Sequence, residues 1–219
     1  MMIIDLFIYV LIMKYDMLSI KPALPSLITL FFAYIGFSIT TPVLIDLSLK
    51  ATNHYFWLTI MMSSYPIGAI LGANLIGIMS DYLGRKKTLL VSLLLSAICY
   101  ALAGVAIYHQ SMIWLACIRL LQGSIEGSMV IAQRTIADTI PQKKHSRFFS
   151  YLYSFPATAF IIGPNILAYN IISQNQSNFS YATPFWFQSI IMLGCAWLVQ
   201  ATFADYHQEK SSHNWKEDI

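Results

Sequence analysis

Charged residues are scarce in this chain. Only 11% of its 219 residues are Asp, Glu, Lys or Arg, whereas 57% are hydrophobic. A soluble domain carries about 25% charged residues, so most of this surface cannot face water, and lipid is the expected solvent. The formal net charge of +3 is too small to indicate a nucleic-acid partner.

The sequence also lacks the marks of a metal site or an enzyme. Cys99, Cys117 and Cys195 lie in apolar runs, without disulfide or metal spacing, and we interpret them as small buried hydrophobic residues. No histidine cluster, nucleophile motif or phosphate-binding loop occurs. We therefore expect no enzyme, no metal and no cofactor, and the chain gives no support for ATP-driven transport.

Six segments are long and apolar enough to cross a bilayer, which takes roughly 20 residues. They cover 24–47, 56–79, 88–108, 112–131, 148–172 and 184–204. The sequence thus predicts an all-α, polytopic membrane protein, with six transmembrane helices in residues 17–205 and a polar cytoplasmic tail at 206–219.

The first sixteen residues, 1–16, do not fit this scheme. Their apolar part is too short to span, and they have neither a basic start nor a small-residue cleavage site. Two interpretations remain open: an interfacial helix, or an extension created by the choice of start codon when translation begins at Met17. We favour the second.

The basic residues predict the orientation. With the chain start inside, Lys50 is the lone basic residue in an outside connection, and Arg119 lies within a span. All the others fall inside: Lys14, Lys21, Arg85, Lys86, Lys87, Arg134, Lys143, Lys144, Arg147, Lys210 and Lys216. We therefore expect both termini in the cytoplasm.

The connection between the second and third spans, GIMSDYLGRKK at 77–87, has a distinctive pattern. Five of its residues match G-x-L-x-D-[RK]-x-G-[RK]-[RK], namely Gly77, Asp81, Gly84, Arg85 and Lys86. That motif joins the second and third helices of major facilitator superfamily transporters, which this chain therefore resembles. Met79 and Tyr82 depart from it, the latter replacing a basic residue.

Each residue type suits such a turn. Glycines let two helix ends approach closely and allow positive φ. Asp81 is expected near the start of the third helix, where an anion suits the helix dipole. The basic residues act as cytoplasmic anchors.

The resemblance extends over residues 17 to about 205. RLLQGSIEG at 119–127 is similar to the family's fourth-helix motif R-x-x-x-G. In the family, the acid at the cytoplasmic end of helix four, here Asp138, commonly pairs with the loop arginine, here Arg85, and forms a conformational latch. IIGPN keeps Gly163 and Pro164 of a helix-five antiporter motif, without its other glycines. The likeness is nearest the multidrug and tetracycline branches of drug:proton antiporters.

This resemblance implies an amino-terminal six-helix half, built from two inverted three-helix repeats, whereas a complete member has twelve helices in two halves. It implies proton-coupled export of small molecules or drugs, in an integral multi-pass protein of a bacterial cytoplasmic membrane. Three accounts remain open: an inactive fragment or non-transporting interaction module, a half that pairs with a separate carboxy-terminal half, and a homodimer.

Two ionisable residues lie deep in the fourth span. Helical geometry puts Arg119, Gln122 and Glu126 on one face, beside Gly123. A charge at the bilayer centre costs about 3 kcal/mol or more, so this face lines a protein interior or a cavity. Arg119 is a candidate proton relay or anion partner and Glu126 a candidate protonation site. The alternative is an internal ion pair, or hydrogen bonds between helices, that only fix the bundle. Asp46 is expected in the cavity or, preferably, at a solvated helix end.

Small residues recur at intervals of four in the second and fourth spans. Gly68 and Gly72 form one such pair, and Gly123 and Gly127 form the other. This spacing predicts close helix contact in a membrane.

Overall fold

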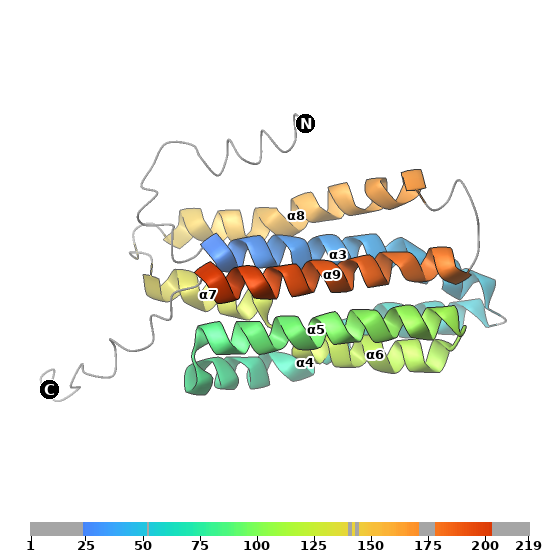
Figure 1. Ribbon diagram of the computed structural model, residues 1–219, viewed down its shortest axis with the longest axis horizontal. Coiled ribbons are helices and arrows are strands. Elements are labelled where there is room, and N and C mark those ends of the chain that lie inside the picture. Colours follow the sequence, from blue (N-terminus) through green and yellow to red (C-terminus); the bar gives the residue numbers. More distant parts are fainter. Residues whose placement is uncertain (1–23, 52, 140–141, 143–144, 171–177, 203–219) are drawn as a thin grey trace, which may run out of the picture.

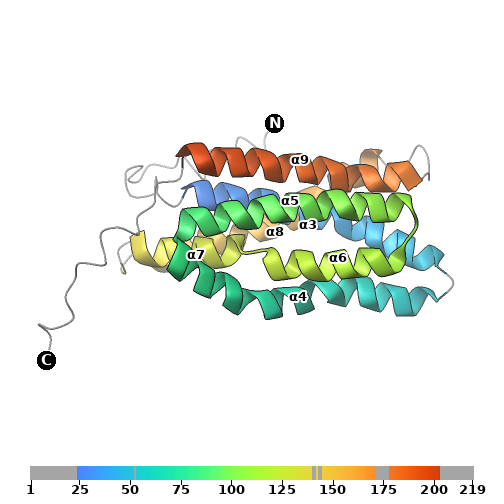
Figure 2. The same cartoon turned by 60° about the horizontal axis from the view of Figure 1, so that its bottom comes forward.

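The computed structural model describes residues 24–51, 53–139, 142, 145–170 and 178–202. The predicted amino-terminal extension, 1–16, and polar tail, 206–219, lie outside these residues. Seven α-helices lie within the described part and run along one common axis, with α6 and α7 following one another end to end (Figure 1 and Figure 2). They are α3 (Leu24–Lys50), α4 (His54–Leu83), α5 (Arg85–Tyr108), α6 (Met112–Ile125), α7 (Ser128–Thr139), α8 (His145–Asn170) and α9 (Asn178–Thr202).

Five described segments are long and apolar enough to span a membrane. They are Leu27–Lys50, Tyr55–Leu83, Arg85–Tyr108, Met112–Thr135 and Tyr181–Thr202. These segments overlap the first, second, third, fourth and sixth predicted spans, so the all-α, polytopic membrane class is confirmed. The fifth predicted span overlaps α8, but its last residues lie outside the described ones, and the fifth crossing stays a prediction.

The fourth span is not one continuous helix. α6 ends at Ile125 and α7 starts at Ser128, because Glu126 has non-helical angles of φ −69° and ψ 97°. The amide of Gly127 donates at 3.2 Å to Ser92 Oγ on α5, which takes the place of a carbonyl within the helix. A side chain on a neighbouring helix therefore satisfies the interrupted backbone, as a membrane interior requires.

The helices pair as inverted repeats predict. The most extensive contacts join α5 to α9, α4 to α6, and α3 to α8. Exchanging the first three helices with the last three, counting α6 and α7 as one, turns the α4–α6 pair into the α8–α3 pair and leaves α5–α9 unchanged. Such a set of contacts is what two repeats related by a two-fold axis in the membrane plane would produce.

Helices α4 and α6 meet at backbone distance. A Cβ atom built on Gly68 would lie 2.0 Å from the carbonyl oxygen of Leu120, and one on Gly72 would lie 1.9 Å from that of Ser124. On the other helix, a Cβ on Gly123 would lie 2.1 Å from the carbonyl oxygen of Tyr65. The glycines predicted to bring membrane helices together do so here.

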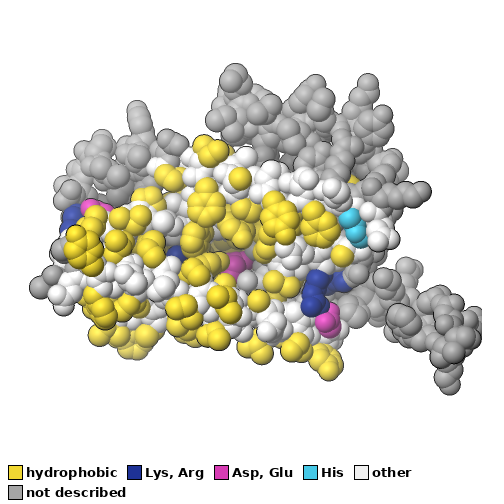
Figure 3. Space-filling view, turned by 180° about the vertical axis from the view of Figure 1, so that it is seen from behind, with side chains coloured by type: hydrophobic (Ala, Val, Ile, Leu, Met, Phe, Trp, Pro, Cys, Tyr) yellow, Lys and Arg dark blue, Asp and Glu magenta, His cyan; other side chains and the backbone are white. Residues whose placement is uncertain are grey.

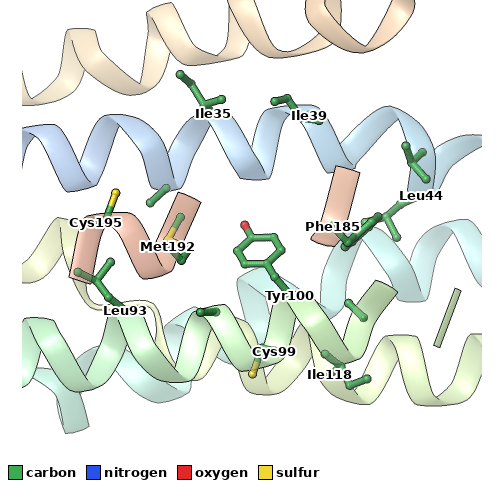
Figure 4. Packing of buried hydrophobic residues seen from close by; sticks show 14 of the residues in the cluster. Ile35, Ile39, Leu44, Leu93, Cys99, Tyr100, Ile118, Phe185, Met192 and Cys195 are labelled. Carbon is green, nitrogen blue, oxygen red and sulfur yellow. The ribbon is translucent and has the colours of Figure 1, made fainter. Parts of the chain in front are cut away.

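The core lies between α3, α5 and α9. Tyr100, Phe185 and Met192 are all at most 2% exposed, and Figure 4 shows Tyr100 pointing from α5 toward α3. Cys99 and Cys195 are buried as predicted, whereas Cys117 is exposed. The outer faces carry large apolar side chains, as expected of a surface in contact with lipid.

A single residue, Gly84, separates α4 from α5. Its angles are φ 85° and ψ 158°, a region that glycine alone enters without strain. This turn explains why the motif requires glycine at this position.

Replacing Gly72 by alanine tests the glycine contact. The added methyl group would meet a carbonyl oxygen that cannot move without separating the helices, so Gly72→Ala should lower the free energy of unfolding by about 2 kcal/mol. Gly194→Ala is the matched control, because a Cβ there has nothing within 4 Å. Unfolding in detergent measures both, and equal stability of the two variants would contradict the contact.

Candidate functional site

The loop motif converges on Arg134 of α7. Arg134 forms an ion pair with Asp81 through Nη1, and the same nitrogen donates to the carbonyl oxygen of Gly77 at 3.0 Å. Arg85 Nη1 donates at 2.9 Å to the carbonyl oxygen of Arg134. These contacts connect the end of α4 and the start of α5 to α7, which forms the second part of the fourth span. Lys86 adds a link to α9, since its Nζ donates to the carbonyl oxygen of Gln200 at 3.0 Å.

The position of Asp81 differs from the expectation. It lies in the last turn of α4 and not at the start of α5. The helix dipole disfavours an anion in this last turn. The Arg134 guanidinium offsets that charge. From the sequence, Arg134 was expected only as one of the basic residues on the cytoplasmic side. Asp138 lies near the end of α7, but its side chain is outside the described part, so its pairing with Arg85 stays a prediction.

Arg119 and Gln122 form an enclosed polar pair in α6. They are 1% and 0% exposed, and Arg119 Nη1 donates to Gln122 Oε1 at 3.1 Å. Arg119 Nε and Gln122 Nε2 have no hydrogen-bond partner among the described residues. No carboxylate of the described residues pairs with Arg119 either, so the internal ion pair considered from the sequence is not formed there. A buried charge with a free donor is costly, and its retention favours a role in function over one in stability.

Aromatic rings surround the guanidinium. Its carbon lies 5.0 Å from the centre of the Tyr65 ring and 5.3 Å from that of Phe37, within the range of a cation–π contact. Phe37 also packs against Tyr65 and against Phe160 of α8, with ring centres 4.8 and 5.7 Å apart. Helices α3 and α4 thus contribute the rings beside Arg119, and α8 packs a further ring against Phe37.

Glu126 lies at the break between α6 and α7 and is less enclosed than Arg119. It is half-buried and lies within electrostatic range of Tyr34, Tyr65 and Tyr100, which belong to three other helices. Figure 3 shows basic and acidic side chains near both ends of one face, and an acidic side chain in a hollow midway between them, flanked by hydrophobic ones. The break thus holds a half-buried intramembrane carboxylate among tyrosine side chains of three other helices.

Gly163 and Pro164 lie inside α8. A Cβ on Gly163 would lie 2.5 Å from Ser38 Oγ and 3.1 Å from the backbone nitrogen of Ile39. Gly163 thus lets α8 approach α3 closely, and this packing role stands beside the predicted antiporter role, which stays a prediction.

A second polar cluster lies at the opposite end of the bundle. Lys50 Nζ is 2.9 Å from Asp46 Oδ2, and the hydroxyl of Tyr181, at the start of α9, donates to Asp46 and accepts from Lys50. When the first three helices are exchanged with the last three, as in the two inverted repeats, the start of α9 corresponds to the start of α5. The end of α3 then corresponds to the end of α7. This cluster therefore corresponds to the Arg85–Arg134 contact. Asp46 is at a partly exposed helix end, as preferred from the sequence.

The described residues contain no group of three or more His, Cys, Asp or Glu side chains that could hold a metal ion.

Comparison with known proteins gives the family. The Major Facilitator Superfamily model matches residues 26–218. The chain belongs to the Major Facilitator Superfamily. It is an integral membrane protein.

Several curated relatives are named tetracycline resistance proteins. The class E protein of Escherichia coli is 27% identical over 186 residues, which cover 82% of this chain and 42% of the relative. The class D protein of Salmonella ordonez is 27% identical over 67% of this chain and 37% of its own length. The chain therefore spans about two fifths of the length of these relatives.

Replacing Arg119 by methionine separates function from stability. Removing an enclosed charge that has no ion pair among the described residues should leave the free energy of unfolding within about 1 kcal/mol of the original value, or raise it. Leu115→Ala, one turn earlier and 1% exposed, should cost about 2–5 kcal/mol. Chemical unfolding in detergent compares the two, and an equally large loss for Arg119→Met would show that Arg119 stabilises the bundle.

Proposed function

We propose that this chain is the amino-terminal half of a transporter that exports small molecules in exchange for protons. The enclosed Arg119 carries the proposal, because among the described residues its Nε has no hydrogen-bond partner and its partner at Nη1 is the amide of Gln122 and not a carboxylate. Arg119 and Gln122 form the wall of the translocation cavity next to Gly123, and Glu126 takes up and releases the proton. The names of the relatives make tetracycline the first substrate to test.

The end with the loop motif lies in the cytoplasm in this proposal. Arg85, Lys86, Lys87 and Arg134 lie at that end, and among the described residues Lys50 is the basic residue at the other. Basic residues favour the cytoplasmic side. The membrane is then a bacterial cytoplasmic membrane, with both termini inside.

Transport measurements test the function directly. In cells without their major efflux pumps, the full chain should lower the accumulation of tetracycline or of a fluorescent cationic dye, and a proton uncoupler should abolish this effect. Arg119→Met should remove it while membrane insertion persists. Normal accumulation in cells with verified insertion, alone and with a carboxy-terminal half of a relative, would instead support a fragment or a non-transporting interaction module.

The loop cluster is proposed as the cytoplasmic latch. The exposed ion pair of Asp81 and Arg134 contributes only about 0–1 kcal/mol to stability, so its value lies in positioning the helix ends. Asp81→Asn should therefore reduce transport several-fold and leave the free energy of unfolding nearly unchanged. A well-inserted Asp81→Asn protein with normal transport would disprove the latch. Lys87→Gln, at an exposed position in the first turn of α5, is the control.

A second six-helix unit completes the proposed transporter. α4 is the least enclosed of the five spans, with 22% of its most apolar window buried, against about half for the others. Its amide residue Asn74 is exposed within the span, and polar groups in a membrane face protein or a cavity. We therefore place the second unit, a separate half or a second copy, against α4.

Cross-linking tells these two partners apart. In a Cys117→Ser background, Asn74→Cys should give a disulfide-linked dimer in membranes if a second copy covers α4. A monomer that cross-links only when a separate carboxy-terminal half is co-expressed would identify that half as the partner. Val91→Cys, exposed on α5, is the control, and equal cross-linking at both positions would contradict the assignment of α4.

A further inference from the structure

A pocket opens inside the bundle at the end opposite α7. It encloses about 420 Å³, within the usual range of small-molecule sites, roughly 300–1,000 Å³. The end of α3, the start of α4, the end of α5 and the starts of α6 and α9 surround it, and these ends meet on the right in Figure 1. It therefore lies within one half, apart from the mid-membrane face of Arg119 and Glu126.

The lining combines an apolar floor with a few polar groups. Leu47, Ile107, Met112 and Leu115 supply aliphatic surface, and Trp57 adds a half-buried indole ring. The remaining side chains can form hydrogen bonds and come from different elements: Lys50, Asn53, Gln110, Ser111 and Tyr181. Apolar walls with a few converging polar groups are the usual composition of a binding site.

The charge of the lining indicates the sign of the ligand. Lys50 is the charged residue of the lining, and its partner Asp46 contacts it from outside the lining. α6 starts at this wall, and the side chain of its N-cap residue, Ser111, makes no capping hydrogen bond. The first amides of a helix and a lysine both favour an anion.

The connection between α5 and α6 contributes two of these polar residues. Gln110 has a φ of 56° because it ends α5 in a Schellman motif, in which its amide donates to the carbonyl oxygen of Ile107 and the amide of Ser111 donates to that of Ala106. This helix end places Gln110 and Ser111 next to each other in the pocket lining.

We propose that this pocket binds a small amphipathic acid, with its carboxylate against Lys50 and its apolar body against Trp57 and the aliphatic floor. The carboxylate competes with Asp46 for the Lys50 ammonium, so binding loosens the contact between α3 and α9 that passes through Tyr181. The site is separate from the proposed translocation path, and its existence does not depend on transport.

Cyclohexanecarboxylate is the probe, and its neutral twin cyclohexanecarboxamide is the matched control. The purified full chain in a neutral detergent is titrated with each, and tryptophan emission is followed. We expect a saturable change with the carboxylate, at least tenfold weaker binding of the carboxamide, and loss of the signal in Trp57→Phe. Equal responses to the two probes, or no saturable change, would overturn the proposal.

Variants then locate the binding. Lys50→Met should weaken it at least tenfold and Lys50→Arg should restore most of it, whereas Lys87→Met, at the other end of α5, should have no effect. Ala106→Phe narrows the pocket, leaves the Lys50 cluster intact, and should weaken binding at least tenfold. It decides the outcome if Lys50→Met fails to fold. Native affinity in Ala106→Phe would place the probe elsewhere and refute the site.

Discussion

The backbone contact between α4 and α6 is the constraint on which the polar interior depends. Because Gly68, Gly72 and Gly123 have no side chains, the two helices touch at carbonyl oxygens. The contact at Gly123 involves the carbonyl oxygen of Tyr65, and it brings the Tyr65 ring to 5.0 Å from the Arg119 guanidinium. A wider separation would move the Tyr65 ring away from that guanidinium, which has no carboxylate partner among the described residues, in a medium where an unsatisfied charge costs several kcal/mol.

The break at Glu126 also depends on how polar groups are satisfied inside the membrane. A continuous helix would bond the amide of Gly127 internally and keep Glu126 on the stripe of Arg119. Instead, Ser92 accepts that amide, and the two charges have different surroundings. Arg119 is enclosed among rings, while Glu126 is half-buried. A carboxylate that exchanges protons needs access that an enclosed arginine does not, so the break separates the two proposed roles.

The sequence was sufficient for the features that depend on local pattern. Apolar length gave five spans that the structure contains, and four-residue glycine spacing gave the α4–α6 contact. Arg119 stood out because an ionised residue in an apolar run has few explanations. Arg134 and Tyr181 could not be found in this way, since their partners are 53 and 135 residues distant in sequence. The break also escaped prediction, because it depends on Ser92 of another helix and no proline marks it.

The two polar clusters occupy related positions in the repeats but differ in chemistry. At the α7 end, Arg134 contacts the Asp81 carboxylate and the Gly77 carbonyl oxygen, while Arg85 contacts the Arg134 backbone. A planar guanidinium with several fixed donors holds helix ends in one geometry. At the other end, Lys50 is a point charge on a flexible stem, shared between a carboxylate and a phenol. An incoming anion can compete for that ammonium but cannot reproduce the backbone contacts of the arginines. At related positions of the two repeats, the arginine cluster is thus suited to fixing the helix ends in one geometry, whereas the Lys50 cluster is suited to responding to a ligand.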